Sequence, residues 1–189
     1  MNISSIFLIF IACLLNSSCA TAKNKAEQPF IWLTNDTKFI LLPAHNIEKP
    51  LDGMQRISAL FGGDEYIINT WVKADKNGMD ITLLNEMGAG IGELLYSNGK
   101  VKFSSAVFPS NLTPEYIIAD FQFCFYSADA LLKSLEKTGF DFSENKKGSG
   151  KSRLIMKDKK TIIEINYNLN YIRLNNHLRG YSYTLQGEF

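Results

Sequence analysis

Alternation of hydrophobic and polar positions predicts β-strands along most of the chain. In residues 65–74 (EYIINTWVKA), one face collects Tyr66, Ile68, Thr70 and Val72. A period of two puts alternate side chains on the same face of a strand. Weaker forms of the pattern extend the prediction to residues 54–61, 79–84, 93–97, 100–108, 153–157, 161–167 and 180–187.

Short turn sequences separate these strands. Asn77-Gly78 and Asn98-Gly99 are typical of type I′ hairpin turns, which need positive φ at both central residues. Residues 157–160 (KDKK) predict a further turn between two later strands. The order of strands and short turns indicates an antiparallel meander.

Two helices are predicted in the middle of the chain. Thr113-Pro114 offers an N-cap and a proline at the first helical position, before the helix Tyr116–Tyr126. Ser127 can cap a second helix from Ala128 to about Lys137, which Gly139 would end. Between this helix and the later strands, the polar residues 142–152 (FSENKKGSGKS) predict a flexible loop.

These elements predict an α+β fold. One curved antiparallel sheet with the helical pair covering its concave face is the simplest packing. With 189 residues and 46% hydrophobic content, the chain is long enough for one domain behind an N-terminal signal.

The first residues predict export. Residues 6–15 (IFLIFIACLL) are an unbroken apolar run before the first charged residue, Lys23. The run is too short for a transmembrane helix and fits a signal peptide. We expect a signal peptide over residues 1–18, a lipidated tether over 19–29 and one β-rich domain over 30–189.

Two cleavage sites are compatible with this signal. Small residues before Cys19 resemble a lipobox, although Asn16 stands where the pattern has leucine, and Cys19 would then carry the lipid anchor, with acyl groups such as palmitate. The alternative is ordinary cleavage after Ala20-Thr21-Ala22. With Ala20 after the cysteine, resemblance to the bacterial sorting rule implies the periplasmic face of the outer membrane.

Charge and chemistry exclude several classes of function. The 20 basic and 19 acidic residues nearly balance, so no nucleic-acid partner is expected. The two histidines lack ligand-spaced neighbours and there is no Gly-x-Ser-x-Gly elbow, so we predict no metal site, no catalytic residue and no cofactor. Cys124 lies among aromatic residues and is interpreted as a small buried hydrophobe.

The segment 116–126 (YIIADFQFCFY) is apolar nearly all round. Such a helix must be covered on most sides. The segment is either a central core helix or a helix that lines or covers a hydrophobic cavity. Asp120 within it is either a functional acid or a carboxylate that reaches a helix end or hydrogen-bonds a strand. In the cavity hypothesis, alternation assigns the wall to the strand residues Tyr66, Ile68, Ile81, Leu83, Leu94, Tyr96, Val101 and Phe103. The helix contributes Tyr116, Phe121 and Phe125.

Three stretches carry a resemblance to a known family. They are Gln55-Arg56 with Gly62-Gly63 and Glu65-Tyr66; residues 112–122 (LTPEYIIADFQ) followed by Ala130-Leu131; and residues 180–185 (GYSYTL). From about Met54 onward the chain resembles an uncharacterised family of proteobacterial outer-membrane lipoproteins, a domain of unknown function.

That resemblance implies a fold similar to the Lol lipoprotein carriers, an incomplete β-barrel whose helices close an apolar cavity. It also implies a link to aryl polyene or related pathways. We therefore expect a non-enzymatic outer-membrane lipoprotein that binds or transfers an acyl, lipoprotein or polyene ligand. The alternative is a structural lipoprotein that docks an envelope protein.

Overall fold

The computed structural model describes residues 28–61, 63–108, 112–148 and 150–189. The predicted signal peptide, Cys19 and the tether as far as residue 27 lie outside the described residues. Among the described residues there is no helix whose length and apolar content would let it span a bilayer.

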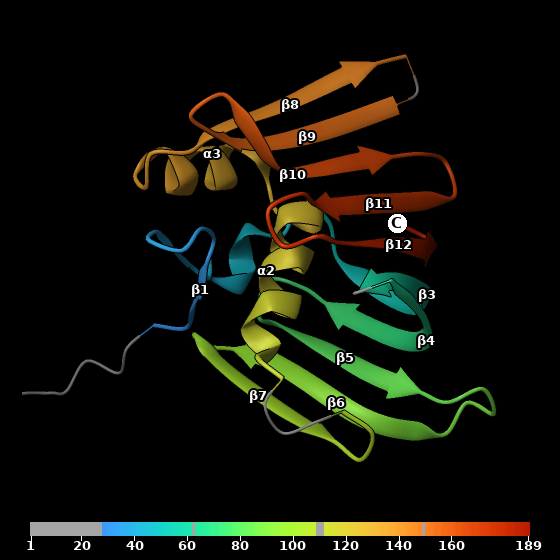
Figure 1. The fold of residues 1–189 in the computed structure, drawn as a ribbon. Helices are drawn as coiled ribbons and strands as arrows, with labels where there is room; N and C mark the ends of the chain where they lie inside the picture. The colour runs from blue at the N-terminus through green and yellow to red at the C-terminus, as the bar shows by residue number, and fades with distance from the viewer. Residues whose placement is uncertain (1–27, 62, 109–111, 149) are drawn as a thin grey trace, which may run out of the picture.

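Most of the chain forms one antiparallel sheet of ten strands, in the spatial order β7-β6-β5-β4-β3-β12-β11-β10-β9-β8 (Figure 1). The strands are β3 (Leu51–Phe61), β4 (Asp64–Ala74), β5 (Gly78–Leu84), β6 (Gly90–Ser97), β7 (Lys100–Ser105), β8 (Asp141–Lys147), β9 (Gly150–Lys157), β10 (Lys160–Tyr167), β11 (Tyr171–Asn176) and β12 (Tyr181–Gly187). Within the described residues the sheet does not close into a barrel, since β7 and β8 are its free edges.

Two helices follow β7 in the chain. Helix α2 (Pro114–Phe125) runs across the sheet, and α3 (Ala128–Glu136) packs against β8 (Figure 1). Helix α2 contacts β7 at one edge and also β11, beyond the centre of the sheet. A single helix reaches both because the sheet curves around it, as the α+β prediction expected.

A small hairpin covers the other side of α2. It consists of β1 (Phe30–Trp32) and β2 (Lys38–Ile40), and the short 3-10 helix η1 (Ala44–Asn46) follows it. Phe39 of the hairpin is fully buried, and its ring lies 4.9 Å from that of Phe123. The nearly all-round apolar surface of α2 is thus covered by the sheet on one side and the hairpin on the other.

The predicted helices and most predicted strands are confirmed. Ser127 accepts a hydrogen bond from the Ala130 N–H at 3.4 Å, as an N-cap does. Thr113 holds the N-cap position of α2 and Pro114 follows it at the start of the helix, as predicted, but the Thr113 side chain makes no capping hydrogen bond. The Thr113 carbonyl accepts from the Tyr116 N–H instead.

The first two turns differ from each other. Asn98 and Gly99 have φ of 51° and 68°, which confirms a type I′ turn. The same prediction is wrong for Asn77-Gly78, where neither residue has positive φ. There the turn is centred one residue earlier, on Lys76 and Asn77, because the Asp75 N–H donates to the Gly78 carbonyl. The Asp75 carboxylate accepts from the N–H groups of Asn77 and Gly78 and so stabilises this turn.

The predicted loop over residues 142–152 is wrong, because the segment forms a hairpin of β8 and β9. Its inward positions include Glu144 and Arg153, which are paired across the two strands. A buried ion pair replaces the apolar residues that mark other strands, so the alternation is lost from the sequence. Strands β1, β2 and β11 were also not predicted; β1 and β2 have only three residues each.

Candidate functional site

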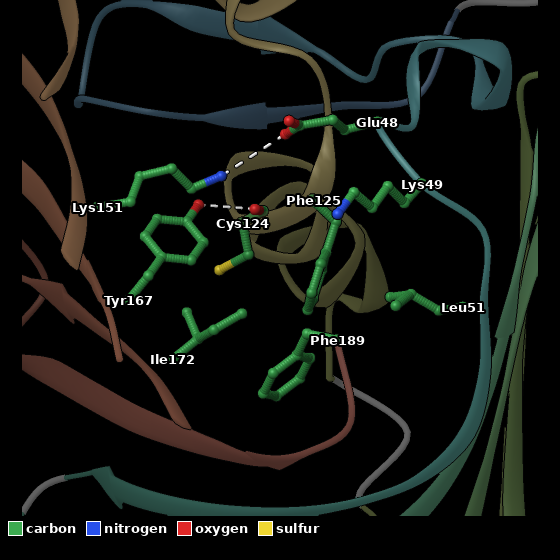
Figure 2. A pocket seen from close by; sticks show the side chains of 9 residues that line it. All are labelled: Glu48, Lys49, Leu51, Cys124, Phe125, Lys151, Tyr167, Ile172 and Phe189. Carbon is green, nitrogen blue, oxygen red and sulfur yellow. Dashed lines mark hydrogen bonds and ion pairs between the residues drawn. The ribbon is translucent and has the colours of Figure 1, made fainter. Parts of the chain in front are cut away.

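A pocket opens between the C-terminal end of α2 and the concave face of the sheet (Figure 2). Its cavity volume is about 150 Å3. The lining residues come from the segment before β3, from α2, from the four strands β3, β9, β10 and β11, and from the segment after β12: Glu48, Lys49, Leu51, Cys124, Phe125, Lys151, Tyr167, Ile172 and Phe189.

The floor of the pocket is apolar and aromatic. Phe125 lies between Phe121, one turn earlier in the helix, and Phe189 at the mouth. Its ring centroid is 4.6 Å from that of Phe121 and 5.7 Å from that of Phe189. Ile172 of β11 is 2% exposed, whereas Phe189 is 41% exposed. A second, more open hollow of about 410 Å3 shares Tyr167, Ile172 and Phe189 with the pocket. Phe189 therefore stands between two adjoining spaces.

The rim of the pocket is charged. The Lys151 ammonium lies 3.6 Å from Glu48, 3.8 Å from Glu144 and 4.2 Å from the centroid of the Tyr167 ring. Lys49 lies on the opposite side, and in Figure 2 both ammonium groups point inward. Within the described residues, the Lys49 side chain makes no hydrogen bond or ion pair.

Arg153 of β9 lies behind this rim and is fully buried. Its guanidinium donates to Glu144 at 2.8 Å and to the main-chain carbonyls of Phe123 and Cys124 at 2.7 and 3.2 Å. Burial alone would raise the pKa of Glu144, but the hydrogen bond from Arg153 and the nearby positive charges lower the pKa below its usual value. Glu144 therefore stays ionised beside Arg153.

The Cys124 side chain lines the pocket but is only 1% exposed. Burial raises the pKa of its thiol well above the usual range, so the nucleophilic thiolate is disfavoured. Its carbonyl accepts a 2.7 Å hydrogen bond from the Tyr167 hydroxyl. The interpretation of Cys124 as a buried hydrophobe is confirmed.

A second polar cluster lies farther along the same interface. Asp120 is 5% exposed and accepts a 2.7 Å hydrogen bond from the Tyr181 hydroxyl of β12, which in turn accepts from Asn176. Burial raises the pKa of Asp120 to about 7, against the opposing effects of Tyr181, Tyr183 and Arg179. The structure bears out the second interpretation of Asp120, in which its carboxylate hydrogen-bonds a strand.

The eleven predicted cavity residues occupy the concave side in different states of burial. Six are buried in the core: Ile81, Leu83, Leu94, Tyr96, Phe121 and Phe125. Four are partly buried against that core: Ile68, Val101, Phe103 and Tyr116. Tyr66 is 50% exposed. Phe125 alone of the eleven lines the pocket described above, and the ligand-binding role of the set stays a prediction.

Sequence reasoning missed most of the pocket. Tyr167 and Ile172 are cross-strand partners of β10 and β11, and Lys151 of β9 faces Tyr167 from the other side. Because β8 and β11 were not predicted, nothing placed these three residues together. Alternation within β10 could have assigned Tyr167 to the same face as Ile163 and Ile165, which are fully buried.

The sequence that forms this sheet and its two helices is similar to a known protein family. A sequence model described as "Protein of unknown function (DUF3261)" matches residues 52–187, from β3 to β12. The chain belongs to the DUF3261 family. The DUF3261 match includes both α-helices and all ten strands of the sheet except Leu51, the first residue of β3, whereas β1 and β2 precede it. No curated protein matches the chain.

Proposed function

We propose that the protein binds, and passes on, a lipid-like molecule whose hydrocarbon end enters the pocket beneath α2. The observation that carries the proposal is the combination in one opening of an apolar aromatic floor and a charged rim. Amphiphiles such as acyl chains, the acyl groups of a lipoprotein or a polyene carboxylic acid have the matching chemistry. No cofactor is required for this binding.

The driving force is burial of apolar surface, at roughly 25 cal/mol per Å2. The enclosed volume of about 150 Å3 limits how much can enter. Pockets for whole small molecules usually measure about 300–1,000 Å3. With Phe189 in its present position, we infer that one end of the chain occupies the pocket and the rest lies in the adjoining hollow.

We place this activity at the periplasmic face of the outer membrane, with Cys19 carrying the lipid anchor. The support is the apolar run of residues 6–15, followed by small residues before Cys19. An anchor of this kind would hold the pocket near a membrane that both supplies and receives amphiphiles.

A second candidate is an envelope lipoprotein that docks another protein and carries no lipid. The observation that favours it is the packing of the β5–β6 region, where Ile81, Leu94 and Tyr96 are each at most 4% exposed. Tyr96 also donates a 2.8 Å hydrogen bond to the Leu42 carbonyl. This part of the concave face is filled by the protein itself.

A matched pair of tryptophan substitutions on β11 tests the first candidate. Ile172→Trp fills the pocket, whereas Tyr171→Trp changes the adjacent residue, which faces out and is 37% exposed. Titration with a fluorescent fatty acid should show at least about ten-fold weaker binding for Ile172→Trp alone. Equal affinity in both variants would contradict the pocket as the binding site.

Loss of folding could imitate the expected result for Ile172→Trp. Circular dichroism and urea unfolding therefore accompany each titration. Phe189→Ala supplies an independent measurement, because it removes the side chain between the two spaces without adding bulk to the core. We expect this variant to take up longer acyl chains than the parent protein does, and an unchanged chain-length preference would count against the site.

A further inference from the structure

We propose that the outward face of the β1–β2 hairpin is a membrane-contact surface that rests on the headgroup region of a lipid bilayer. This surface consists of Phe30, Trp32, Lys38 and Ile40 and is separate from the pocket. The inference goes beyond ligand binding and does not depend on it.

The register of the hairpin divides its residues into two faces. Phe30 pairs with Ile40, Ile31 with Phe39, and Trp32 with Lys38. Ile31 and Phe39 point inward and are 3% and 0% exposed, which fixes the hairpin on the core. Cross-strand partners share a face, so the other four side chains all point outward.

Two exposed apolar side chains and one partly exposed lysine give the outward face its character. Trp32 is 41% exposed and Ile40 is 48% exposed. The Lys38 ammonium lies 3.6 Å from the ring centroid of Phe30 and 5.2 Å from that of Trp32. Tryptophan beside a basic residue suits the membrane interface, where the ring sits at headgroup depth and the cation meets lipid phosphate.

The surface is held in place by polar contacts at its back. The main-chain carbonyl of Trp32 accepts hydrogen bonds from the Arg179 guanidinium and from the Tyr116 hydroxyl. Lys157 donates to Thr37 at 2.7 Å from the sheet side. A rigid hairpin presents its side chains without an ordering cost on binding.

The position of the hairpin in the sequence favours a lipid bilayer as the partner of this surface. Residues 20–29 separate Cys19 from β1. Fully extended, ten residues span at most about 36 Å. An acyl group on Cys19, as proposed above, would therefore keep the hairpin within reach of the bilayer surface.

The size of the surface also favours a bilayer over a protein partner. Specific protein interfaces bury about 1,200–2,000 Å2 in total. The four outward side chains of a short hairpin supply only a small part of such an area. Shallow contact with a bilayer requires no larger complementary surface, and its strength scales with the apolar area inserted.

The two tryptophans of the chain give a direct test. Trp32 lies on the proposed contact surface, whereas Trp71 lies on the outward face of β4, where it is 46% exposed and donates to Asp52. Trp71→Phe leaves only Trp32 to fluoresce, and Trp32→Phe leaves only Trp71. Both changes are made in a Cys19→Ala protein processed by the export host, so that no acyl chain of its own attaches it to vesicles.

Vesicles of phosphatidylcholine with phosphatidylglycerol are then added to each protein. We expect the emission of Trp32 to shift to the blue and that of Trp71 to stay unchanged. An unshifted Trp32, with or without sedimentation of the protein with vesicles, would overturn the proposal. No sedimentation at all would leave a protein partner as the alternative occupant of this surface.

A second matched pair keeps the test independent of fluorescence. Ile40 and Met54 are equally exposed, at 48% and 47%, but Met54 lies on β3 away from the hairpin. Ile40→Ser should reduce vesicle binding about five-fold because it removes apolar area from the contact. Met54→Ser should leave binding unchanged, and equal losses in the two variants would contradict the assigned surface.

Discussion

The Arg153 guanidinium donates a 2.7 Å hydrogen bond to the main-chain carbonyl of Phe123, so a buried side chain of β9 closes the C-terminal end of α2. The last carbonyls of a helix have no partner within the helix and carry partial negative charge. Arg153 also reaches Cys124 and is paired with Glu144. The contact thus fixes the end of α2 that contributes Cys124 and Phe125 to the pocket lining.

Arg153→Met should lower the free energy of unfolding by about 3–5 kcal/mol, because it removes the buried partner of Glu144 and the donor to the Phe123 carbonyl at the end of α2. Arg173→Met is the matched control, since Arg173 is an exposed arginine on β11 of the same sheet. We expect its effect to stay within about 0.5 kcal/mol. Urea unfolding of both variants measures the difference, and similar losses would show that Arg153 is not a structural cap.

Asp120 should make stability depend on pH. Its pKa is raised from 3.8 to about 7 in the folded protein, so the folded state binds more protons than the unfolded state between these values. The resulting stabilisation is complete below about pH 4 and is lost as the pH rises through about 7, with an upper limit of roughly 4 kcal/mol.

The Asp120→Asn variant isolates this effect because the other carboxylates are the same in both proteins. We expect the unfolding free energy of the parent protein, relative to the variant, to fall from about pH 4 to about pH 7 and then to level off. Chemical unfolding across this range provides the measurement. A difference that grows as pH rises, or that does not change, would mean that Asp120 is ionised throughout.

Gly92 marks a close approach of two strands. A Cβ atom at Gly92 would lie 2.9 Å from the Ser105 Cβ and 3.0 Å from the Leu83 Cδ1, whereas at Gly90 the nearest atom would be 3.9 Å away. Gly92→Ala should therefore destabilise the protein by about 1–3 kcal/mol. Gly90→Ala, two residues earlier on β6, should be neutral or stabilising by up to about 1 kcal/mol. Equal thermal unfolding midpoints for the two variants would refute the close approach.

Lys49 should favour ligands with an anionic head. Lys49→Glu reverses the charge at the rim, so the affinity for a fluorescent fatty acid should fall about three- to ten-fold while that for the matching alcohol is retained. Lys100→Glu, at the exposed lysine that begins β7, makes the same change away from the pocket lining. If both reversals weaken fatty-acid binding equally, the charge of the whole protein is the cause and Lys49 has no specific role.

The parts of the fold that could be predicted are those in which one face of an element is apolar. In residues 65–74, Val72 and Ala74 are 2% exposed, whereas Trp71, beside Val72, is 46% exposed. The period of two can therefore be recognised in the sequence. Helix α2 was predicted from Thr113-Pro114 at its start and from the long apolar segment 116–126 that follows. In β8 and β9 the inward Glu144 and Arg153 satisfy each other across the sheet, and this pairing cannot be recognised before the register is known.

The candidate site was harder to predict for the same reason. Lys49, Tyr167 and Phe189 belong to distant segments that meet only when β3, β10 and β12 lie on one curved sheet around α2. Alternation correctly placed Ile81, Leu94 and Tyr96 on the concave side, but it does not show whether the space before them is empty. The structure fills that space with α2, η1 and the segment that contains Leu42.

Native mass spectrometry of the processed Cys19→Ala protein, purified from a host with an outer membrane and followed by lipid extraction, tests the central claim most directly. We expect discrete masses of bound amphiphiles, with lower occupancy in Ile172→Trp and unchanged occupancy in Tyr171→Trp. A folded protein that has a clean ligand-free mass and takes up no fluorescent fatty acid would contradict lipid binding beneath α2.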